Sequence, residues 1–252
     1  MIPSRAQLKA WRQLRDRAGR EAHGQYLMEG EHLCQEALRE GKALAILCQA
    51  DKQDRFRHLL DVALPCYQLS AREFEAISDT RTPQGIAALC ALPPNAPLTG
   101  LGERLVCLNA LQDPGNVGTI LRTMDAAGFS GLIMDQESAD AFSPKALRAS
   151  MGAALRIRVR VSLSLEEDLR ALNGFALVAG LLDGAPFYAR PKLEGPLCLI
   201  IGNEGAGIAP DIAALASLRL RLPMPGKAES LNAAVAASIM IYDFVREWED
   251  RP

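Results

Sequence analysis

Short apolar runs alternate with helix-like segments from residue 104 to the end of the chain, and this order restricts the fold more than any other feature. Six runs are predicted to form strands, at 104–109, 131–134, 157–161, 175–179, 197–201 and 218–222. Helices are predicted at 117–127, 144–150, 165–172, 210–215 and 231–248. Strands that alternate with helices of this length form a mostly parallel sheet with both faces covered. Such sheets bind ligands at the carboxyl ends of their strands.

A Pro- and Gly-rich segment without charge, at 93–102, separates this region from a smaller first part. Composition of this kind is typical of an inter-domain linker. The first part is predicted to hold helices at 4–20, 29–40 and 53–60 and strands at 44–48, 66–67 and 85–92. Ser70 and Glu73 have the spacing of a capping box and predict one more helix. The fold class is therefore α/β, with a small α/β domain at 1–92, a linker at 93–102 and a mostly parallel-sheet domain at 103–252.

Charge is nearly balanced over the 252 residues, with 28 Lys and Arg against 30 Asp and Glu and a formal net charge of −2. This balance argues against a protein whose whole surface binds nucleic acid, but it permits a local basic patch. Residues 1–20 carry six basic side chains and one Asp. Residues 141–165 carry no acid and five basic side chains, namely Lys145, Arg148, Arg156, Arg158 and Arg160. The two stretches predict a phosphate-binding face. An amphipathic helix and an arginine-rich strand are the alternative interpretation.

The six cysteines form no CxxC pair, and the three histidines lack the spacing of a zinc site. Most of the cysteines lie in apolar runs, where a thiol behaves as a small hydrophobic group. We therefore expect reduced thiols, no metal site and a cytoplasmic protein. No apolar run approaches the roughly 20 residues of a membrane span, so no membrane association is expected.

The first polar strand-to-helix junction follows the strand at 104–109. Asp113, Pro114 and Gly115 form a turn signal, Asn116 is a candidate helix cap, and Arg122 follows within the predicted helix. A turn, a cap and a surface arginine would account for these residues without any chemistry.

Two further junctions follow the strands at 197–201 and 218–222. The first reads Gly202-Asn203-Glu204-Gly205-Ala206-Gly207, and its glycines permit close approach of a ligand to the backbone. Its spacing differs from the dinucleotide-binding fingerprint, and a glycine-rich turn with an exposed Glu204 is the alternative. In the second, 222–232, Ser230 is predicted as the N-cap of the last helix and Asn232 lies in its first turn.

Together, these three junctions resemble a known family. Asp-Pro-x-Asn-x-Gly-x-x-x-Arg at 113–122, Gly-x-Glu-Gly at 202–205 and Leu-Pro-Met-x-Gly-x-x-x-Ser-Leu-Asn at 222–232 are similar to the three motifs of the SpoU-type RNA ribose 2′-O-methyltransferases. The resemblance implies a homodimeric S-adenosylmethionine enzyme whose C-terminal half forms a trefoil knot. Residues 26–38 resemble, less specifically, the opening of the family's L30e-like substrate-binding domain.

The resemblance also implies roles for individual residues. Gly202, Leu222 and Leu231 would contact S-adenosylmethionine, with Gly180, Asn203, Pro223 and Met224 as neighbours. The polar site would consist of Asn116, Arg122, Glu204, Ser230 and Asn232. The family is described with the arginine as the base. A guanidinium is effectively always protonated, so Arg122 could instead hold the target phosphate and stabilise the developing alkoxide. Glu204 is expected to orient Arg122 or Asn116.

The sequence therefore predicts a cytoplasmic, homodimeric, S-adenosylmethionine-dependent RNA 2′-O-ribose methyltransferase. Ribosomal RNA is the preferred substrate because of the separate N-terminal domain, and transfer RNA is the alternative. A catalytically silent knotted RNA-binding or assembly factor is a second alternative, against which the five intact polar residues argue. A nicotinamide-dependent oxidoreductase would need a fingerprint that the sequence lacks.

Overall fold

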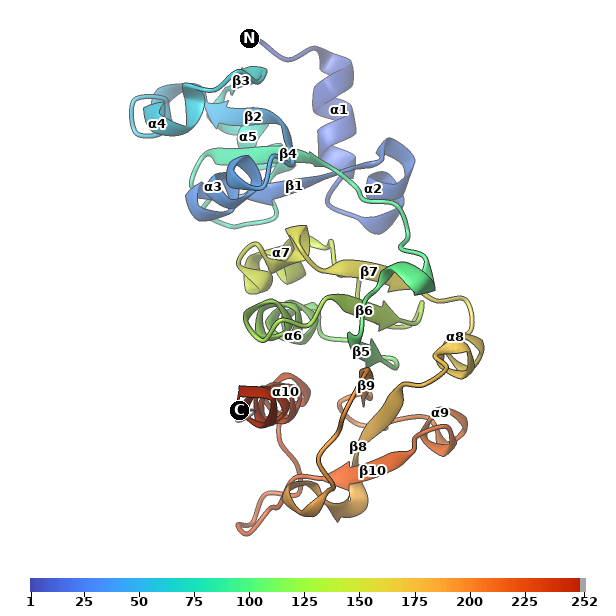
Figure 1. The fold of residues 1–252 in the computed structure, drawn as a ribbon. Helices are drawn as coiled ribbons and strands as arrows, with labels where there is room; N and C mark the ends of the chain where they lie inside the picture. Colours follow the sequence, from blue (N-terminus) through green and yellow to red (C-terminus); the bar gives the residue numbers. More distant parts are fainter. Residues whose placement is uncertain (250–252) are drawn as a thin grey trace. The chain divides into compact units, whose positions relative to one another are not determined.

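The computed structural model describes residues 1–249 (Figure 1). The chain folds into two compact units. The first unit contains Met1–Pro94 and Phe142–Leu155, and the second contains Asn95–Ala141 and the chain from Arg156 onward.

The second unit is built on a six-stranded, entirely parallel sheet with the strand order β10-β8-β9-β5-β6-β7. Its strands are β5 (Arg104–Leu108), β6 (Gly131–Met134), β7 (Arg158–Val161), β8 (Ala176–Pro186), β9 (Leu197–Ile201) and β10 (Leu218–Arg221). All six predicted strands are confirmed, and β8 is longer than predicted. The central strand β9 is buried along its whole length, as expected for a parallel strand covered on both faces.

Helices cover both faces of this sheet (Figure 1). The helices α6 (Pro114–Ala126) and α10 (Ala233–Glu249) pack on one face, and α8 (Leu165–Ala171) and α9 (Pro210–Ala214) on the other. The core beneath α8 and α9 contains Leu169 and Ile212 packed against Cys107 and Ile200 of the sheet.

Two helices of the second unit begin at different residues from those predicted. Asp113, and not Asn116, caps α6: its Oδ1 accepts the N–H of Gly115, and Pro114 occupies the first turn. Asn232, and not Ser230, caps α10, because its Oδ1 accepts the N–H groups of Ala234 and Val235 at 2.9 and 3.2 Å. Both corrections free a polar side chain, Asn116 and Ser230, from a capping role.

The first unit contains a four-stranded sheet with the order β1-β4-β2-β3. Its strands are β1 (Gln25–Glu29), β2 (Ala43–Gln49), β3 (Cys66–Leu69) and β4 (Ile86–Ala91), and its longer helices include α3 (Glu31–Arg39) and α5 (Ala71–Ile77). The predicted capping box of Ser70 and Glu73 is present at α5. Strand β1 was missed, because its five residues precede α3 by only Gly30, which has a positive φ of 105°.

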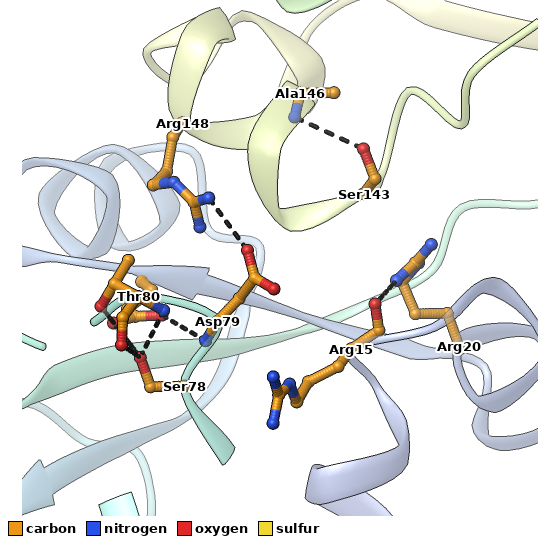
Figure 2. A network of polar contacts seen from close by, with 9 residues as sticks. Arg15, Arg20, Ser78, Asp79, Thr80, Ser143, Ala146 and Arg148 are labelled. Carbon is orange, nitrogen blue, oxygen red and sulfur yellow. Dashed lines mark hydrogen bonds and ion pairs between the residues drawn. The ribbon is translucent and has the colours of Figure 1, made fainter. Parts of the chain in front are cut away.

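The predicted helix at 4–20 is in fact two helices, α1 (Arg5–Gln13) and α2 (Arg17–His23). Asp16 caps α2 by accepting the N–H of Gly19. The buried Arg20 side chain donates to the carbonyl of Arg15 at 3.0 Å (Figure 2). It also donates to the carbonyl of Leu14 at 2.8 Å, at the end of α1. Arg20 therefore satisfies backbone groups that the end of a helix leaves without partners, and it is not part of a surface for phosphate.

Residues 142–155, which contain α7 (Pro144–Ser150), pack in the first unit. The ring of Phe142 lies 5.3 Å from that of Tyr26, and Arg148 forms a 2.9 Å ion pair with Asp79 (Figure 2). The predicted boundaries of 1–92, 93–102 and 103–252 would instead keep this segment in the second domain. Within the predicted linker, Leu101 is fully buried in the core of the second unit. The predicted end at residue 252 lies outside the described residues.

Carboxylates from elsewhere in the chain compensate three of the five basic side chains at 141–165, which weakens the predicted phosphate-binding face. In addition to the Arg148–Asp79 pair, Arg156 pairs with Asp125 at 2.7 Å and Arg160 with Asp168 at 2.6 Å. Burial would raise the pKa of Asp168, but the hydrogen bonds from Arg160 and Ser162 outweigh it and lower that pKa.

Other expectations concern thiols and membranes. All six cysteines are free, and five of them are buried. Burial raises the pKa of Cys48 to about 11 and that of Cys90 to about 12, so these thiols are protonated packing groups.

No helix among residues 1–249 has the length and apolar character needed to cross a bilayer.

Candidate active site

A cavity of about 400 Å³ opens at the carboxyl ends of β8, β9 and β10 in the second unit. Six of the seven predicted cofactor-binding residues line it: Gly180, Gly202, Asn203, Leu222, Met224 and Leu231. Pro223 does not. Glu204 and Ser230 also line the cavity, whereas Asn116, Arg122 and Asn232 are not among its lining residues.

One wall of the cavity is a bulge in β8. Ala179 pairs with Arg219 of β10, but the next paired residues are Ala185 and Leu220. Residues 180–184 therefore leave the ladder, and Gly180, Leu181 and Leu182 face the cavity. Leu181 and Leu182 were missed because the predicted strand ended at residue 179. The two leucines directly after a glycine were the available signal.

The loop after β9 forms the floor of the cavity through a tight backbone hairpin. Asn203 and Gly207 exchange backbone hydrogen bonds of 2.9 and 3.0 Å, and the Asn203 side chain accepts the N–H groups of Gly205 and Ala206. A Cβ atom at Gly202 would lie 2.3 Å from the carbonyl carbon of Gly207. Residue 202 must therefore be glycine for this hairpin to close.

Glu204 joins the loop after β9 to the start of α6. Its Oε1 accepts the N–H of Asp113 at 3.1 Å and the side-chain amide of Asn116 at 2.9 Å. Its Oε2 accepts the N–H of Gln112 at 3.2 Å. Three donors from one turn thus converge on a single carboxylate.

Asn116 extends this network to the last helix. The Nδ2 of Asn232 donates to the Oδ1 of Asn116 at 3.0 Å. A chain of hydrogen bonds from Glu204 through Asn116 to Asn232 therefore connects the three motifs. In the sequence, Glu204 is 88 residues and Asn232 is 116 residues from Asn116. The side chain of Asn116 has both its donor and its acceptor engaged, which fixes the orientation of the amide.

Two polar residues that the sequence analysis did not single out support this arrangement. Asp135, directly after β6, accepts the N–H of Ala110 at 2.7 Å and the side-chain amide of Asn109 at 2.9 Å. Ala110 has a positive φ of 55°, which strains a non-glycine residue. Asn109 in turn accepts the N–H of Ala209 at 2.7 Å. The signal was available, because both residues directly follow buried strands.

Burial alone would raise the pKa of Glu204. The hydrogen bonds from Asn116 and from the backbone N–H groups of Asp113 and Gln112 outweigh this effect and lower the pKa below its usual range. Glu204 is therefore a carboxylate that only accepts hydrogen bonds, and it is poorly suited to take up a proton near neutral pH.

Arg122 stands apart from this network. It is exposed on α6 and follows Asn116 by six residues, so at 3.6 residues per turn the two side chains project from different faces. Within the described part of the chain, no hydrogen bond or ion pair joins Arg122 to Glu204, Ser230 or Asn232. Of the two partners predicted for Glu204, the structure places Asn116 against it and not Arg122. Ser230 is exposed at the rim of the cavity.

The lowered pKa of Glu204 makes its contribution to stability depend on pH. This contribution is fully present above the ordinary glutamate pKa of about 4.3 and is lost as the pH falls through the lower folded value. We expect the free energy of unfolding of the wild type to exceed that of Glu204→Gln above about pH 5, with the difference shrinking below about pH 4. Urea unfolding at a series of pH values measures this. Glu229→Gln, on the same rim, is the matched control, and a difference for Glu204→Gln that is constant with pH would contradict the assignment.

Both units are similar to known protein families. The model of the SpoU rRNA Methylase family matches residues 103–242, and that of the MRM3-like substrate binding domain matches residues 5–88. The 23S rRNA (guanosine(2553)-2′-O)-methyltransferase RlmP of Bacillus subtilis is 38% identical over 237 residues, which cover 93% of this chain and 94% of that protein.

Solved structures agree with these matches. The SpoU methyltransferase AviRb from Streptomyces viridochromogenes, in complex with AdoMet, superposes with a TM-score of 0.87 at 26% identity and covers 99% of this chain and 100% of its own. An AdoMet-bound rRNA methyltransferase from Sinorhizobium meliloti gives a TM-score of 0.82 at 29% identity, covering 97% of both chains. The motifs, the parallel sheet and these similarities agree, and the chain belongs to the SpoU rRNA methylase family.

Proposed function

We propose that the protein methylates a ribose 2′-oxygen of ribosomal RNA in the cytoplasm, with S-adenosylmethionine as the methyl donor. The observation that carries this proposal is the hydrogen-bond chain Glu204–Asn116–Asn232, which joins three distant motifs beside a cavity at the strand ends. Ribosomal RNA is preferred to transfer RNA because the Bacillus subtilis relative, named for 23S rRNA, aligns over 93% of the chain.

The cavity fits S-adenosylmethionine in size and in chemistry. Its volume of about 400 Å³ falls in the range of roughly 300–1,000 Å³ that is usual for cofactor sites. The apolar side chains of Leu222, Met224 and Leu231 can enclose an adenine ring. The backbone of Gly202 and Asn203 offers hydrogen-bonding groups to its edge, and Gly180 leaves room beside Met240.

S-adenosylmethionine supplies an activated methyl group to the attacking ribose oxygen. The polar residues of the chain would position the reactants, which can contribute about 7–11 kcal/mol to an acceleration. Glu204 holds Asn116, and Asn116 orders the start of α10 through Asn232. The exposed hydroxyl of Ser230 at the rim can donate to, or accept from, the ribose.

We assign to Arg122 the role of holding an RNA phosphate and stabilising the negative charge that develops on the 2′-oxygen. A protonated guanidinium can bind a phosphate through two parallel hydrogen bonds. Its exposure and the absence of a carboxylate against it among the described residues leave Arg122 available to RNA.

We further propose that the protein is a homodimer that packs through α10, and that its C-terminal half is knotted. Val235, Ile239 and Tyr242 recur every three or four residues along α10 and are 46%, 36% and 51% exposed. Such an apolar face on a helix is typical of an interface. Thr123 of α6 hydrogen-bonds Ser238 of α10 at 2.9 Å, so Arg122 is on the helix next to this face.

RNA is proposed to contact the exposed face of α1 in the first unit. Arg5, Lys9 and Arg12 recur at intervals of four and three residues and are exposed, beside the stripe that buries Leu8 and Trp11. Among the described residues, neither Arg5 nor Lys9 has an ion-pair partner. Without the buried Arg20, the basic stretch at 1–20 still contributes this helix face, in the unit that matches a substrate-binding domain.

Arg122→Ala should lower methyl transfer by about 100-fold or more, because mutations that remove preorganised charge stabilisation have effects of this size. Its affinity for S-adenosylmethionine should stay within about twofold of wild type. Transfer of labelled methyl groups to ribosomal RNA and calorimetry measure the two quantities. Arg170→Ala, an exposed arginine on α8, is the control.

Two outcomes of this experiment separate the claims. Loss of cofactor binding in Arg122→Ala would overturn the role given to that residue. A wild-type protein that leaves no 2′-O-methyl mark on ribosomal RNA, in cells or with purified components, would overturn the proposed function.

Tyr242→Glu should convert the homodimer into monomers, because a charge in an apolar interface is desolvated without a partner. Light scattering after size-exclusion chromatography measures the mass. Leu163→Glu is the control, since Leu163 is 90% exposed in the loop before α8, which packs on the other face of the sheet. A Tyr242→Glu variant with wild-type mass would exclude this interface.

Arg5→Gln/Lys9→Gln should weaken RNA binding and flatten its salt dependence. Each lost phosphate contact removes about 0.7–0.9 from the slope of log K against log salt. We therefore expect a decrease of about 1.4–1.8 in the slope, measured by filter binding or anisotropy at several salt concentrations. Lys42→Gln/Arg57→Gln removes the same charge from other exposed positions of the first unit. Equal effects of the two double variants would show that only total charge matters.

A further inference from the structure

A buried cluster of charges lies between α10 and the chain that follows β8. Arg190 comes directly after the short 3-10 helix η4 (Phe187–Ala189), and only 2% of its side chain is exposed. Its guanidinium lies over the rings of Phe187 and Phe244, 4.3 and 4.5 Å from their centroids. Its Nη1 is 3.0 Å from Asp243 and 3.1 Å from Glu247.

This cluster is an expensive arrangement if stability is its only purpose. The side chains of Asp243 and Glu247 are 9% and 11% exposed. Within the described chain, the Nε and Nη2 atoms of Arg190 and the Oε2 of Glu247 are buried without a hydrogen-bond partner. Replacing a buried ion cluster with apolar groups is often neutral or stabilising. A role in fixing how two segments meet explains the cluster better.

The segments that meet here are the two walls of the cavity. Gly180, Leu181 and Leu182 form the wall contributed by β8, and Ala236 and Met240 form part of the wall contributed by α10. A Cβ atom at Gly180 would lie 3.3 Å from the sulfur of Met240, so the walls are already in close contact at that point.

The residues of α10 that lie near Gly180 and those that pair with Arg190 belong to one stripe of the helix. Met240, Asp243, Phe244 and Glu247 are spaced three, four and seven residues from the first, and side chains at these intervals share a helix face. Residues 180–190 thus touch one stripe of α10 near both ends: at Met240 beside the cavity, and at Asp243 and Glu247 beyond it.

We propose that Arg190 is a positioning residue for the cofactor site: by locking the end of segment 180–190 onto α10, it sets the separation of the two cavity walls. Arg190 does not line the cavity, so it acts through Leu181, Leu182 and Met240. The inference rests on the proposed function in one respect, which is that S-adenosylmethionine occupies the cavity.

The test uses the full-length protein and removes the charges together. Arg190→Met alone would leave Glu247 buried without its cation and Asp243 with only the exposed Arg246, and could fail to fold. The triple variant Arg190→Met/Asp243→Asn/Glu247→Gln leaves no buried charge unpaired and should unfold within a few degrees of the wild type. Its dissociation constant for S-adenosylmethionine should rise about tenfold, while kcat at saturating cofactor and the affinity for RNA stay within about twofold.

Two further variants sharpen the result. Arg190→Lys keeps a cation but lacks the planar fork of arginine, so its affinity for S-adenosylmethionine should lie between those of the triple variant and the wild type. Arg246→Gln removes an arginine that pairs with the same Asp243 but is 64% exposed, and it should change nothing. A merely structural role would lower the melting temperature without separating the cofactor's dissociation constant from kcat.

Amide hydrogen exchange gives a readout that needs no ligand. The N–H groups of Leu181 and Leu182 should exchange faster in the triple variant than in the wild type, because their segment has lost its anchor. Exchange at the wild-type rate in the triple variant would overturn the inference. If the wild type binds S-adenosylmethionine, an unchanged dissociation constant in the triple variant would overturn it as well. A wild type that does not bind S-adenosylmethionine would instead overturn the proposed function, and exchange would still decide the role of Arg190.

Discussion

The site depends on a carboxylate that accepts hydrogen bonds from a turn distant from it in the sequence. The turn at 112–116 presents three N–H donors, and Glu204 accepts all three with its two oxygens. Charge-assisted hydrogen bonds are shorter and stronger than neutral ones, so one side chain fixes the start of α6 against the loop after β9. Asn116 then carries this order to Asn232 and to the first turn of α10. Without the carboxylate, the turn at 112–116 would lose three of its hydrogen bonds to the loop after β9.

The sheet supplies the rest of the geometry. Because all six strands are parallel, their carboxyl ends meet at one edge, and the bulge in β8 shares one cavity with the loops after β9 and β10. Glycines then permit contacts that side chains would prevent: a Cβ at Gly202 would overlap Gly207, and one at Gly184 would lie 2.6 Å from the backbone of Leu220. The separate unit, with its basic helix face on α1, matches a domain family named for substrate binding.

Sequence reasoning located the strands of the second unit because buried parallel strands are short apolar runs with polar residues at their ends. It placed the caps less well, since Asp113 and Asn116, or Ser230 and Asn232, are equally suitable cap residues; Pro114 was the signal for the earlier start of α6. Counting charges along the chain overestimated the unpaired positive charge at 141–165, because Asp79, Asp125 and Asp168 from other segments pair with three of its arginines. The burial of Arg20 and Arg190 depends on tertiary contacts that no local pattern contains.

The first unit is built from two separate segments of the chain, and this affects the order in which the protein folds. Part of that unit, Phe142–Leu155, follows Pro94 by nearly fifty residues of the other unit. A ribosome adding about 5–20 residues per second needs several seconds to synthesise the missing piece. During that interval, the surface that will receive Phe142 and Leu147, including the ring of Tyr26, has no partner. The part of the protein that is made first must therefore wait for the second to be partly translated before it can be completed.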